Sequence, residues 1–378
     1  MKFSADSADL KRAIRAACEV IPSRAPTPEL TCVYLNASEG QLLVSGRNES
    51  VFVELTCPCS PVKDGEALVP AKTLLDYVSL AEGEVILSLD SKNALTILSG
   101  SHKSTIVCLD ASHYQPAQFT GKPAFSLPGN ALSLGLSRVA FSAAVELARP
   151  AMVGVRVILL PDGSLRFGAI DNVRVAICHT ADCDVADGAP ADLSVTVPAA
   201  ILRLVQTLFG GMESVLFSFE PGRGMFSCEE CRLVFAAPAG AFPSAALDRM
   251  MGLSYPIRVT ASAKAMADAA SLASVAAESS PAGSRFLVRL ETDAASHELR
   301  FSAGNEMTAA STSVPTDHDG GDITIGFSVR LLRDAIAACA KEADDLEISF
   351  TSSSGPARIA PVSDSSTLTT FVMPVRMA

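Results

Sequence analysis

The chain has 378 residues, of which 48% are hydrophobic and 19% are charged, and this supplies enough apolar side chains for two or three globular cores. The formal net charge of −11 argues against a simple nucleic-acid-binding protein, because such proteins usually present a basic surface. The longest apolar runs have about eight residues, against the roughly 20 that a membrane-spanning helix needs, and the N-terminus lacks the apolar core of a signal peptide. We therefore expect a cytoplasmic protein whose 10 cysteines are reduced thiols.

The N-terminal segment predicts a short strand followed by a helix over residues 8–20. Ser7 is the expected N-cap of this helix, and Leu10 and Ile14 follow with the spacing of one helix face. A second strand leads into a helix predicted over residues 70–81. The other segments alternate apolar and polar residues between Gly, Asn, Asp and Ser, which predicts antiparallel strands.

The same order of elements recurs twice more along the chain. Further helices, each after a short strand, are predicted over residues 129–144, 198–211, 261–276 and 328–341. Val69, Val197 and Ile325 stand before the second helix of each copy and are 128 residues apart. The sequence thus predicts an α+β fold of three repeated units, each with two helices packed on antiparallel sheets, and domains at residues 1–121, 122–253 and 254–378.

The charge of the chain is distributed unevenly. The six predicted helices have a net charge of +5, which leaves −16 for the rest of the chain. If the six helices lined one surface, this acidic protein would present a locally positive face that could follow a phosphate backbone. The alternative is that helix surfaces simply carry charges of both signs.

No catalytic motif is present: the sequence contains no HExxH, no Gly-x-Ser-x-Gly, no P-loop and no dinucleotide-binding fingerprint. Cys57 with Cys59, and Cys228 with Cys231, form one CxC and one CxxC, whereas a structural zinc site usually needs four ligands. The CxxC falls on a turn between two predicted strands, which favours a plain hairpin. We therefore expect neither a metal nor another cofactor, and no enzymatic activity.

The C-terminal segment predicts a strand that ends before an apolar tail. Phe371 and Val372 fit a final strand, but Pro374 cannot donate a hydrogen bond to a sheet. An apolar tail of this kind needs to be covered by the protein's own core or to form part of a groove.

Five segments in the right order resemble the bacterial sliding clamp, the beta subunit of DNA polymerase III. They span the whole chain: MKF at the start, VPAK, VTVP, IGFSVRLLRDAI, and FVMPVRM at the end. The resemblance implies three similar domains per chain and a head-to-tail homodimeric ring whose helices surround duplex DNA without reading its sequence. It also implies partners that bind through short linear motifs, namely the replicative DNA polymerase, the clamp loader and repair polymerases.

The resemblance further implies a partner-peptide pocket between the second and third domains. Its residues would be Met152, Ile170, Asn172, Arg174, Val175, Pro243, Ser354, Pro356, Val372, Met373, Pro374, Val375, Arg376 and Met377. Apolar walls with a few polar groups suit a short motif with Leu and Phe anchors. For DNA binding, the resemblance implies Arg24 and Arg149 in loops. Position on the predicted helices adds Lys72, Arg12, Arg15, Arg138, Arg203, Arg330 and Arg333.

Three segments depart from the family pattern. The pocket segment, often TDGHRLA in the family, is IDNVRVA here, and VPRK in the second unit is replaced by Val197-Pro198-Ala199-Ala200. In the third unit, the strand that can hold the dimer has Glu306 as its only carboxylate. We therefore expect a more apolar contact between subunits, formed by Lys103 and Ile106 against Leu272 and Val275.

Two alternatives stay open at this point. The loss of basic residues in the second unit is compatible with a clamp-like scaffold that tethers DNA weakly. The Cys and His residues, among them Cys178, His179 and Cys183, are compatible with a metal-dependent enzyme.

Overall fold

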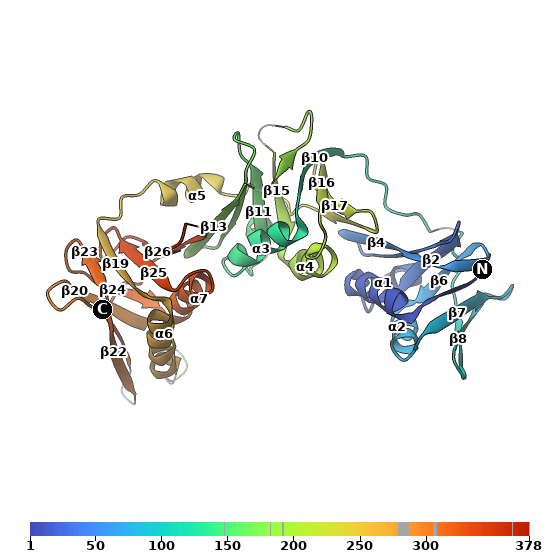
Figure 1. Ribbon diagram of the computed structural model, residues 1–378, viewed down its shortest axis with the longest axis horizontal. Helices are drawn as coiled ribbons and strands as arrows, with labels where there is room; N and C mark the ends of the chain where they lie inside the picture. The colour runs from blue at the N-terminus through green and yellow to red at the C-terminus, as the bar shows by residue number, and fades with distance from the viewer. Residues whose placement is uncertain are drawn as a thin grey trace. The chain divides into compact units, whose positions relative to one another are not determined.

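The structure is a computed structural model that describes residues 1–112, 114–146, 148–181, 183–190, 193–278, 287–304, 308–364 and 366–377 (Figure 1). The chain divides into two compact units. The first comprises Met1–Ser133, Asp182–Leu193 and Ile201–Ala237, and the second comprises Leu134–Ala181, Ser194–Ala200 and Pro238–Ala378. Every strand pair in the described residues is antiparallel, as the alternating sequence patterns predicted.

The first unit contains two antiparallel sheets. The five-stranded sheet has the order β5 (Ser60–Lys63), β1 (Lys2–Asp6), β7 (Glu84–Leu89), β8 (Ala94–Ser99) and β9 (His102–Val107). The nine-stranded sheet has the order β14 (Asp184–Val185), β10 (Lys122–Leu127), β16 (Val215–Glu220), β17 (Arg223–Cys228), β18 (Cys231–Ala236), β4 (Val51–Pro58), β3 (Gln41–Arg47), β2 (Cys32–Ser38) and β6 (Gly65–Pro70). The pairing of β18 with β4 joins the first and second predicted repeats in one sheet, and we call it the first seam.

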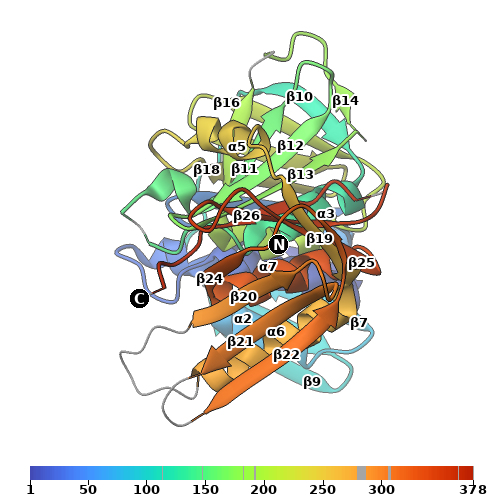
Figure 2. The same ribbon diagram turned by 90° about the vertical axis from the view of Figure 1, so that its left-hand side faces the viewer.

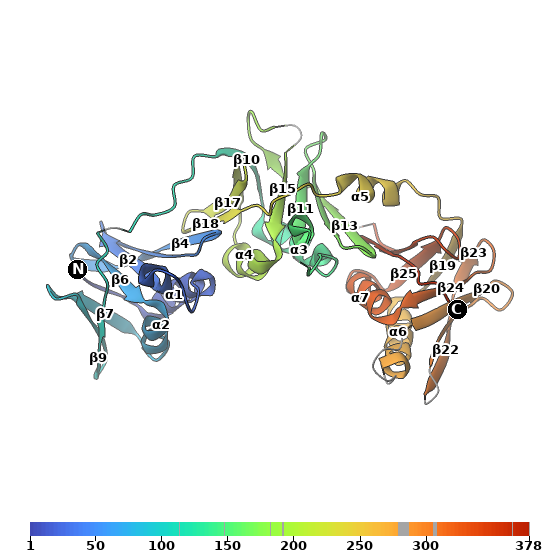
Figure 3. The ribbon, with the colours of Figure 1, turned by 180° about the vertical axis from the view of Figure 1, so that it is seen from behind.

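Helices of the first unit are α1 (Ser7–Val20), α2 (Ala71–Ser79), α4 (Leu202–Phe209) and the 3₁₀ helix η1 (Pro28–Thr31). In Figure 3, α1 and α2 lie side by side in blue on the sheets of this unit. Leu10 and Ile14 of α1 are fully buried, as predicted. The predicted N-cap was wrong by one residue: Asp6 caps the helix, because its carboxylate accepts a hydrogen bond of 2.8 Å from the backbone N–H of Ala8.

The second unit also contains two antiparallel sheets. The nine-stranded sheet has the order β15 (Ser194–Pro198), β11 (Gly154–Leu159), β12 (Leu165–Ile170), β13 (Arg174–Thr180), β27 (Thr369–Val372), β26 (Ala357–Pro361), β25 (Asp345–Phe350), β19 (Ile257–Ser262) and β23 (Asp317–Asp319). The four-stranded sheet has the order β22 (Ala309–Pro315), β21 (Glu298–Gly304), β20 (Leu287–Asp293) and β24 (Thr324–Ser328). The pairing of β13 with β27 joins the second and third predicted repeats, and we call it the second seam.

Helices of the second unit are α5 (Ser244–Met251), α6 (Ala263–Glu278), α7 (Val329–Cys339) and the 3₁₀ helix η2 (Pro150–Met152). Figure 2 shows α6 behind β21 and β22, which it contacts. The helix α3 (Gly129–Ala140) and the 3₁₀ helix η3 (Ala199–Ile201) each contribute residues to both units. In the described part of the chain, no helix is long and apolar enough to cross a membrane.

All six predicted helices are present, and a seventh was missed. The helix predicted over 129–144 ends at Ala140, and the one predicted from residue 198 begins as the 3₁₀ turn η3. The missed helix is α5, which has only eight residues, one of them buried. A helix this short has only about two turns, which is too few for a clear hydrophobic periodicity. An isolated helix of that length is also not stable without tertiary packing.

Two connectors run between the predicted repeats. The first connector, residues 108–121, crosses the nine-stranded sheet of its unit, and the ring of Tyr114 stacks on Tyr34 at 4.2 Å. Arg47 donates a hydrogen bond to the Gln115 carbonyl at 3.1 Å, and Arg223 donates one to the Gln118 carbonyl at 2.9 Å. The second connector, residues 237–256, contains α5. The predicted domain boundaries fall in these connectors.

Candidate functional sites

Most of the predicted DNA-binding side chains are on the surface. Seven of them are exposed, and they lie on four helices and two loops: Arg12, Arg15, Lys72, Arg203, Arg330, Arg24 and Arg149. Within the first unit, α1 and α4 border a cavity of about 420 Å³ whose lining includes Lys11, Arg12 and Arg15. An acidic chain therefore does carry exposed cations on its helices.

Two of the predicted cations are held within the protein instead. Arg138 donates from Nε to Glu342 Oε1 at 2.9 Å and from Nη2 to Glu342 Oε2, and only 17% of the Arg138 side chain and 12% of the Glu342 side chain are exposed. Arg333 donates to Ser274 Oγ at 2.7 Å. Arg138 therefore links α3 to the segment after α7, and its bidentate pairing leaves it little capacity to bind an external phosphate.

The predicted peptide pocket corresponds in part to a hydrophobic cluster in the second unit. Met152, Ile170 and Val175 are buried there, where they are joined by residues that sequence reasoning missed. We define the outer cluster as the buried residues Ala151, Met152, Ile170, Val175, Ile177, Phe242, Leu247, Tyr255 and Phe371. Helix α5 supplies Leu247, which packs so closely on Gly168 of β12 that a Cβ atom at Gly168 would lie 2.7 Å from Leu247 Cδ1.

Alternation along β13 separates two of the predicted pocket residues. Val175 belongs to the outer cluster, whereas the guanidinium of Arg174 lies 5.7 Å from the ring of Phe141, in the turn after α3. Arg174 donates from Nε to Asp171 Oδ2 at 2.8 Å and lies 3.4 Å from Asp334 Oδ2 of α7. Successive side chains of a strand point to opposite faces, so Arg174 stands on the helix side of the sheet and not beside the apolar residues.

The C-terminal tail follows the outer cluster only at its beginning. Val372 is buried at the end of β27, and the backbone N–H of Met373 donates to the Val173 carbonyl at 2.8 Å. The tail then leaves strand geometry, as Pro374 predicted, and Val375 donates to the Gly326 carbonyl at 2.8 Å. The last predicted tail residues, Arg376 and Met377, are exposed.

The remaining pocket predictions fall at the edges of this region. Asn172 is exposed and accepts a hydrogen bond of 3.1 Å from Arg149, which brings a predicted peptide contact and a predicted DNA contact together. Pro243 precedes the first residue of α5. Pro356 is buried and Ser354 is exposed, both in the turn between β25 and β26. Phe242 and Leu247 were missed because the segment AFPSAALDRM gives no clear helical signal on its own.

The predicted subunit contacts differ in their exposure. Leu272 and Val275 of α6 are 48% and 67% exposed. On β9, Lys103 is exposed but Ile106 is buried in its own sheet, and the exposed apolar residue of that strand is Val107, at 74%. Glu306 lies outside the described residues.

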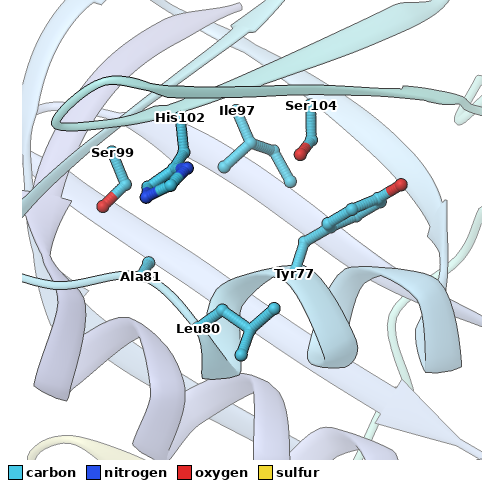
Figure 4. A pocket seen from close by; sticks show the side chains of 7 residues that line it. All are labelled: Tyr77, Leu80, Ala81, Ile97, Ser99, His102 and Ser104. Carbon is cyan, nitrogen blue, oxygen red and sulfur yellow. The ribbon is translucent and has the colours of Figure 1, made fainter.

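A cavity of about 380 Å³ lies between α2 and the strands β8 and β9 (Figure 4). Tyr77 and Leu80 border it on one side, and Ile97 and His102 face them from the strands. Leu80, the residue after α2, is 80% exposed.

The cysteines show no arrangement for metal binding. Cys228 and Cys231 stand opposite each other at the end of the β17–β18 hairpin. Among the described residues, no three His, Cys, Asp or Glu side chains gather so that they could hold a metal ion. Burial raises the pKa of the Cys18 thiol to about 11, so this thiol is protonated and unreactive at neutral pH.

Two family models match this chain, and together they cover more than half of it. They are "DNA polymerase III beta subunit, N-terminal domain", at residues 1–118, and "DNA polymerase III beta subunit, C-terminal domain", at residues 254–376. This chain belongs to the DNA polymerase III beta sliding clamp family. The family is a non-catalytic processivity factor, so the alternative of a metal-dependent enzyme is set aside.

Relatives and solved structures of the clamp family agree over the full length of the chain. The beta sliding clamp of Staphylococcus aureus is 23% identical over 371 residues, which cover 95% of this chain and 94% of the relative. The sliding clamp of Bacillus subtilis has a TM-score of 0.90 at 19% identity, and that of Pseudomonas aeruginosa bound to griselimycin has a TM-score of 0.90 at 22% identity, each with 100% of both chains covered. The fold is therefore the clamp fold, with repeated α+β domains as the sequence predicted.

Proposed function

We propose that this clamp forms a homodimeric ring around duplex DNA and tethers the replicative DNA polymerase and other motif-bearing partners in the cytoplasm. The three domains would be residues 1–121, 122–253 and 254–378. The observation that carries the proposal is the exposure of basic side chains on helices of an acidic chain, such as Arg15 on α1, Lys72 on α2 and Arg203 on α4. Attraction to phosphates without base contacts gives binding without sequence preference, which sliding requires.

Retention on circular DNA tests the encircling part of this proposal. The wild-type clamp, loaded with a clamp loader onto nicked circular DNA, should stay bound through gel filtration and be released when the DNA is cut. Replacing Arg15, Lys72 and Arg203 by Glu should lower retention at least tenfold. The matched control replaces Lys63, Lys92 and Lys122 by Glu, because these lysines are also exposed but lie outside the helices. Equal retention of both variants would contradict the proposed DNA surface.

Exposed apolar residues on the edge strand β9 and on the helix α6 support the proposed dimer. β9 is the last strand of its sheet and carries Val107, while β22 is the last strand of the four-stranded sheet next to α6. An edge strand with exposed apolar side chains tends to pair with another chain. We propose that Lys103 and Val107 of one subunit face Leu272 and Val275 of the other, with Ile106 supporting β9 from inside.

Light scattering tests the dimer. Val107→Asp should shift the clamp from dimer to monomer. The matched control is Val62→Asp, because Val62 is 72% exposed on β5, at the opposite edge of the same sheet. A Val107→Asp clamp that keeps the wild-type molecular mass would contradict this interface.

A clamp-like scaffold with weak DNA tethering is a second candidate. Two features support it: Arg138 is occupied by Glu342, and Ala199 and Ala200 of η3 are exposed where basic side chains were expected. Such a scaffold would dimerise and bind partner peptides but would fail the retention test with wild-type protein. The two candidates therefore separate in one experiment.

Partner binding is proposed at the outer cluster and the start of the tail. Its support is a set of apolar side chains with polar neighbours at the edge, such as Asn172 and Arg149. A Gln-Leu-x-Leu-Phe peptide should bind the wild-type clamp, and Val173→Asp should weaken it, because Val173 is 41% exposed where the tail meets β13. Unchanged peptide affinity in this variant would contradict the proposed binding site.

A further inference from the structure

One arginine next to the outer cluster is partly buried and has only neutral hydrogen-bond partners. Arg156 lies on β11, and its guanidinium carbon is 5.7 Å from the centre of the Phe242 ring, a member of the outer cluster. Ile158, two residues along the same strand, also packs against the cluster. Side chains two residues apart share one face of a strand, so Arg156 stands on the cluster side of the sheet.

Arg156 has no carboxylate partner among the described residues. Its Nη2 donates to Ser194 Oγ at 2.5 Å and its Nη1 to Thr196 Oγ1 at 3.3 Å, and both of these acceptors are neutral hydroxyls. Its Nε is buried and has no hydrogen-bond acceptor among the described residues. Burial lowers the pKa of Arg156, as expected for a guanidinium that is partly removed from water.

Neighbouring arginines of the same sheet show the usual arrangement. Arg166 of β12 pairs with Asp248 at 2.7 Å, and Arg358 of β26 pairs with Glu347 at 3.0 Å. Removing a guanidinium from water without a counter-charge costs free energy, so proteins normally pair such a group or use it to bind an anion. The planar guanidinium also matches the geometry of a carboxylate better than any other side chain.

We propose that Arg156 binds a carboxylate of the partner peptide, so that this clamp prefers an acidic group next to the apolar anchors. The inference rests on the proposed partner binding at the outer cluster and adds a specificity to it. A carboxylate fits the site because Arg156, whose guanidinium carbon lies 5.7 Å from the centre of the buried Phe242 ring, supplies a positive charge beside the apolar cluster. The carboxylate is either an Asp or Glu side chain of the peptide or the peptide's free C-terminus.

A set of matched peptides tests this preference by fluorescence anisotropy. The parent is Gly-Gln-Leu-Ser-Leu-Phe-Gly with an amidated C-terminus. Each position other than Leu and Phe is changed in turn to Asp and to Asn, and the parent is also made as the free acid. With the wild-type clamp, Asp at one position should bind about tenfold tighter than Asn, or the free acid about tenfold tighter than the amide, in keeping with a hydrogen bond between charged groups.

Three variants assign the preference to Arg156. Arg156→Met should reduce the ratio of Asn to Asp dissociation constants to about one while affinity for the parent changes less than threefold. Arg156→Lys should keep part of the ratio, because it keeps the charge but loses the two-pronged geometry. The matched control is Arg358→Met, which removes a cation from the same sheet and should leave the ratio unchanged.

The peptide measurements distinguish a failure of the proposed role of Arg156 from a failure of the proposed partner site. If the parent binds but every ratio is near one in the wild type, the role of Arg156 is contradicted and the proposed function stands. If no peptide binds, the proposed partner site itself fails. Should Arg156→Met fail to fold, the wild-type clamp still decides: the Asp peptide must lose affinity between 50 and 300 mM KCl more steeply than the Asn peptide, and parallel loss would overturn the inference.

Discussion

The two seams of this clamp have the same sheet arrangement but are covered in different ways. In each, nine antiparallel strands continue from one predicted repeat into the next, through β18 and β4 in the first seam and through β13 and β27 in the second. The first connector lies on its sheet as an extended strap, with Tyr114 stacked on Tyr34. The second connector forms α5 and supplies Phe242, Leu247 and Tyr255 to the outer cluster.

The two connectors also differ in the hydrogen bonds that their polar groups and neighbouring arginines make. Along the first, the hydroxyl groups of Tyr114 and Ser45 share a hydrogen bond of 2.9 Å, and the Thr120 hydroxyl donates to Glu220 at 3.0 Å. The cations beside it, Arg47 and Arg223, both donate to connector carbonyls. Beside the second connector, Arg156 finds only hydroxyls. The two arginines beside the first connector thus find acceptors in the connector itself, whereas Arg156 beside the second has only neutral hydroxyls as partners.

The largest expected effect comes from removing one anchor of each connector. Leu247→Ala and Tyr114→Ala each delete a side chain that packs on a sheet, and each should lower the free energy of unfolding by about 3 kcal/mol. Only Leu247→Ala should also weaken a Gln-Leu-x-Leu-Phe peptide, by at least fivefold. Urea denaturation and peptide titration of the two variants give both quantities. A similar loss of peptide affinity in Tyr114→Ala would show that the seams do not differ in the proposed way.

Breaking one ion pair at each seam should change the free energy of unfolding by a smaller amount. Glu342, paired with Arg138 in the second unit, is largely buried, whereas Glu230, paired with Arg12 in the first unit, is 55% exposed. Glu342→Gln leaves a buried guanidinium without its anion and should cost about 2 kcal/mol, whereas Glu230→Gln should cost less than about 0.5 kcal/mol. Urea denaturation at low and high salt measures both. If the two variants lose equal stability, the second seam is not held by this ion pair.

Repetition and alternation made most of this architecture predictable from the sequence. The 128-residue spacing of Val69, Val197 and Ile325 predicted the repeated units, because each copy needs the same strand and helix to bury the same face. The strand ending at Val372 and the break at Pro374 were predicted from the missing N–H of proline. These features depend on local chemistry, which a sequence displays directly.

Features that depend on contacts between distant segments were not predictable. α5 is stabilised by Leu247 packing on Gly168, a residue 79 positions away, and not by a periodic pattern of its own. Ile106 gave no sign of which face of β9 it occupies, because both Ile106 and Val107 are apolar. The sequence shows that Arg156 and Arg166 are cations. It does not show that Arg166 pairs with a carboxylate whereas Arg156 donates to hydroxyls.

The smallest expected effect is a change in the pH dependence of stability, caused by a histidine in the nine-stranded sheet of the second unit. Burial lowers the pKa of His179 on β13 from its ordinary value of 6.5, and the nearby charge of Arg166 lowers it further. As the pH falls below 6.5, the unfolded chain takes up a proton at this residue before the folded chain does, so the unfolded state binds more protons and stability falls. Above pH 6.5 the imidazole is neutral in both states and contributes no such loss.

His179→Gln removes this titration while keeping a polar side chain of similar length at the same position in β13. Relative to its own value at pH 8, the variant should lose less stability than the wild type between pH 6.5 and pH 5, by under about 1 kcal/mol. Urea denaturation at four pH values in that range measures the difference. Identical pH profiles would mean that the imidazole of His179 titrates alike in the folded and unfolded chains, which would contradict the predicted effect of its burial.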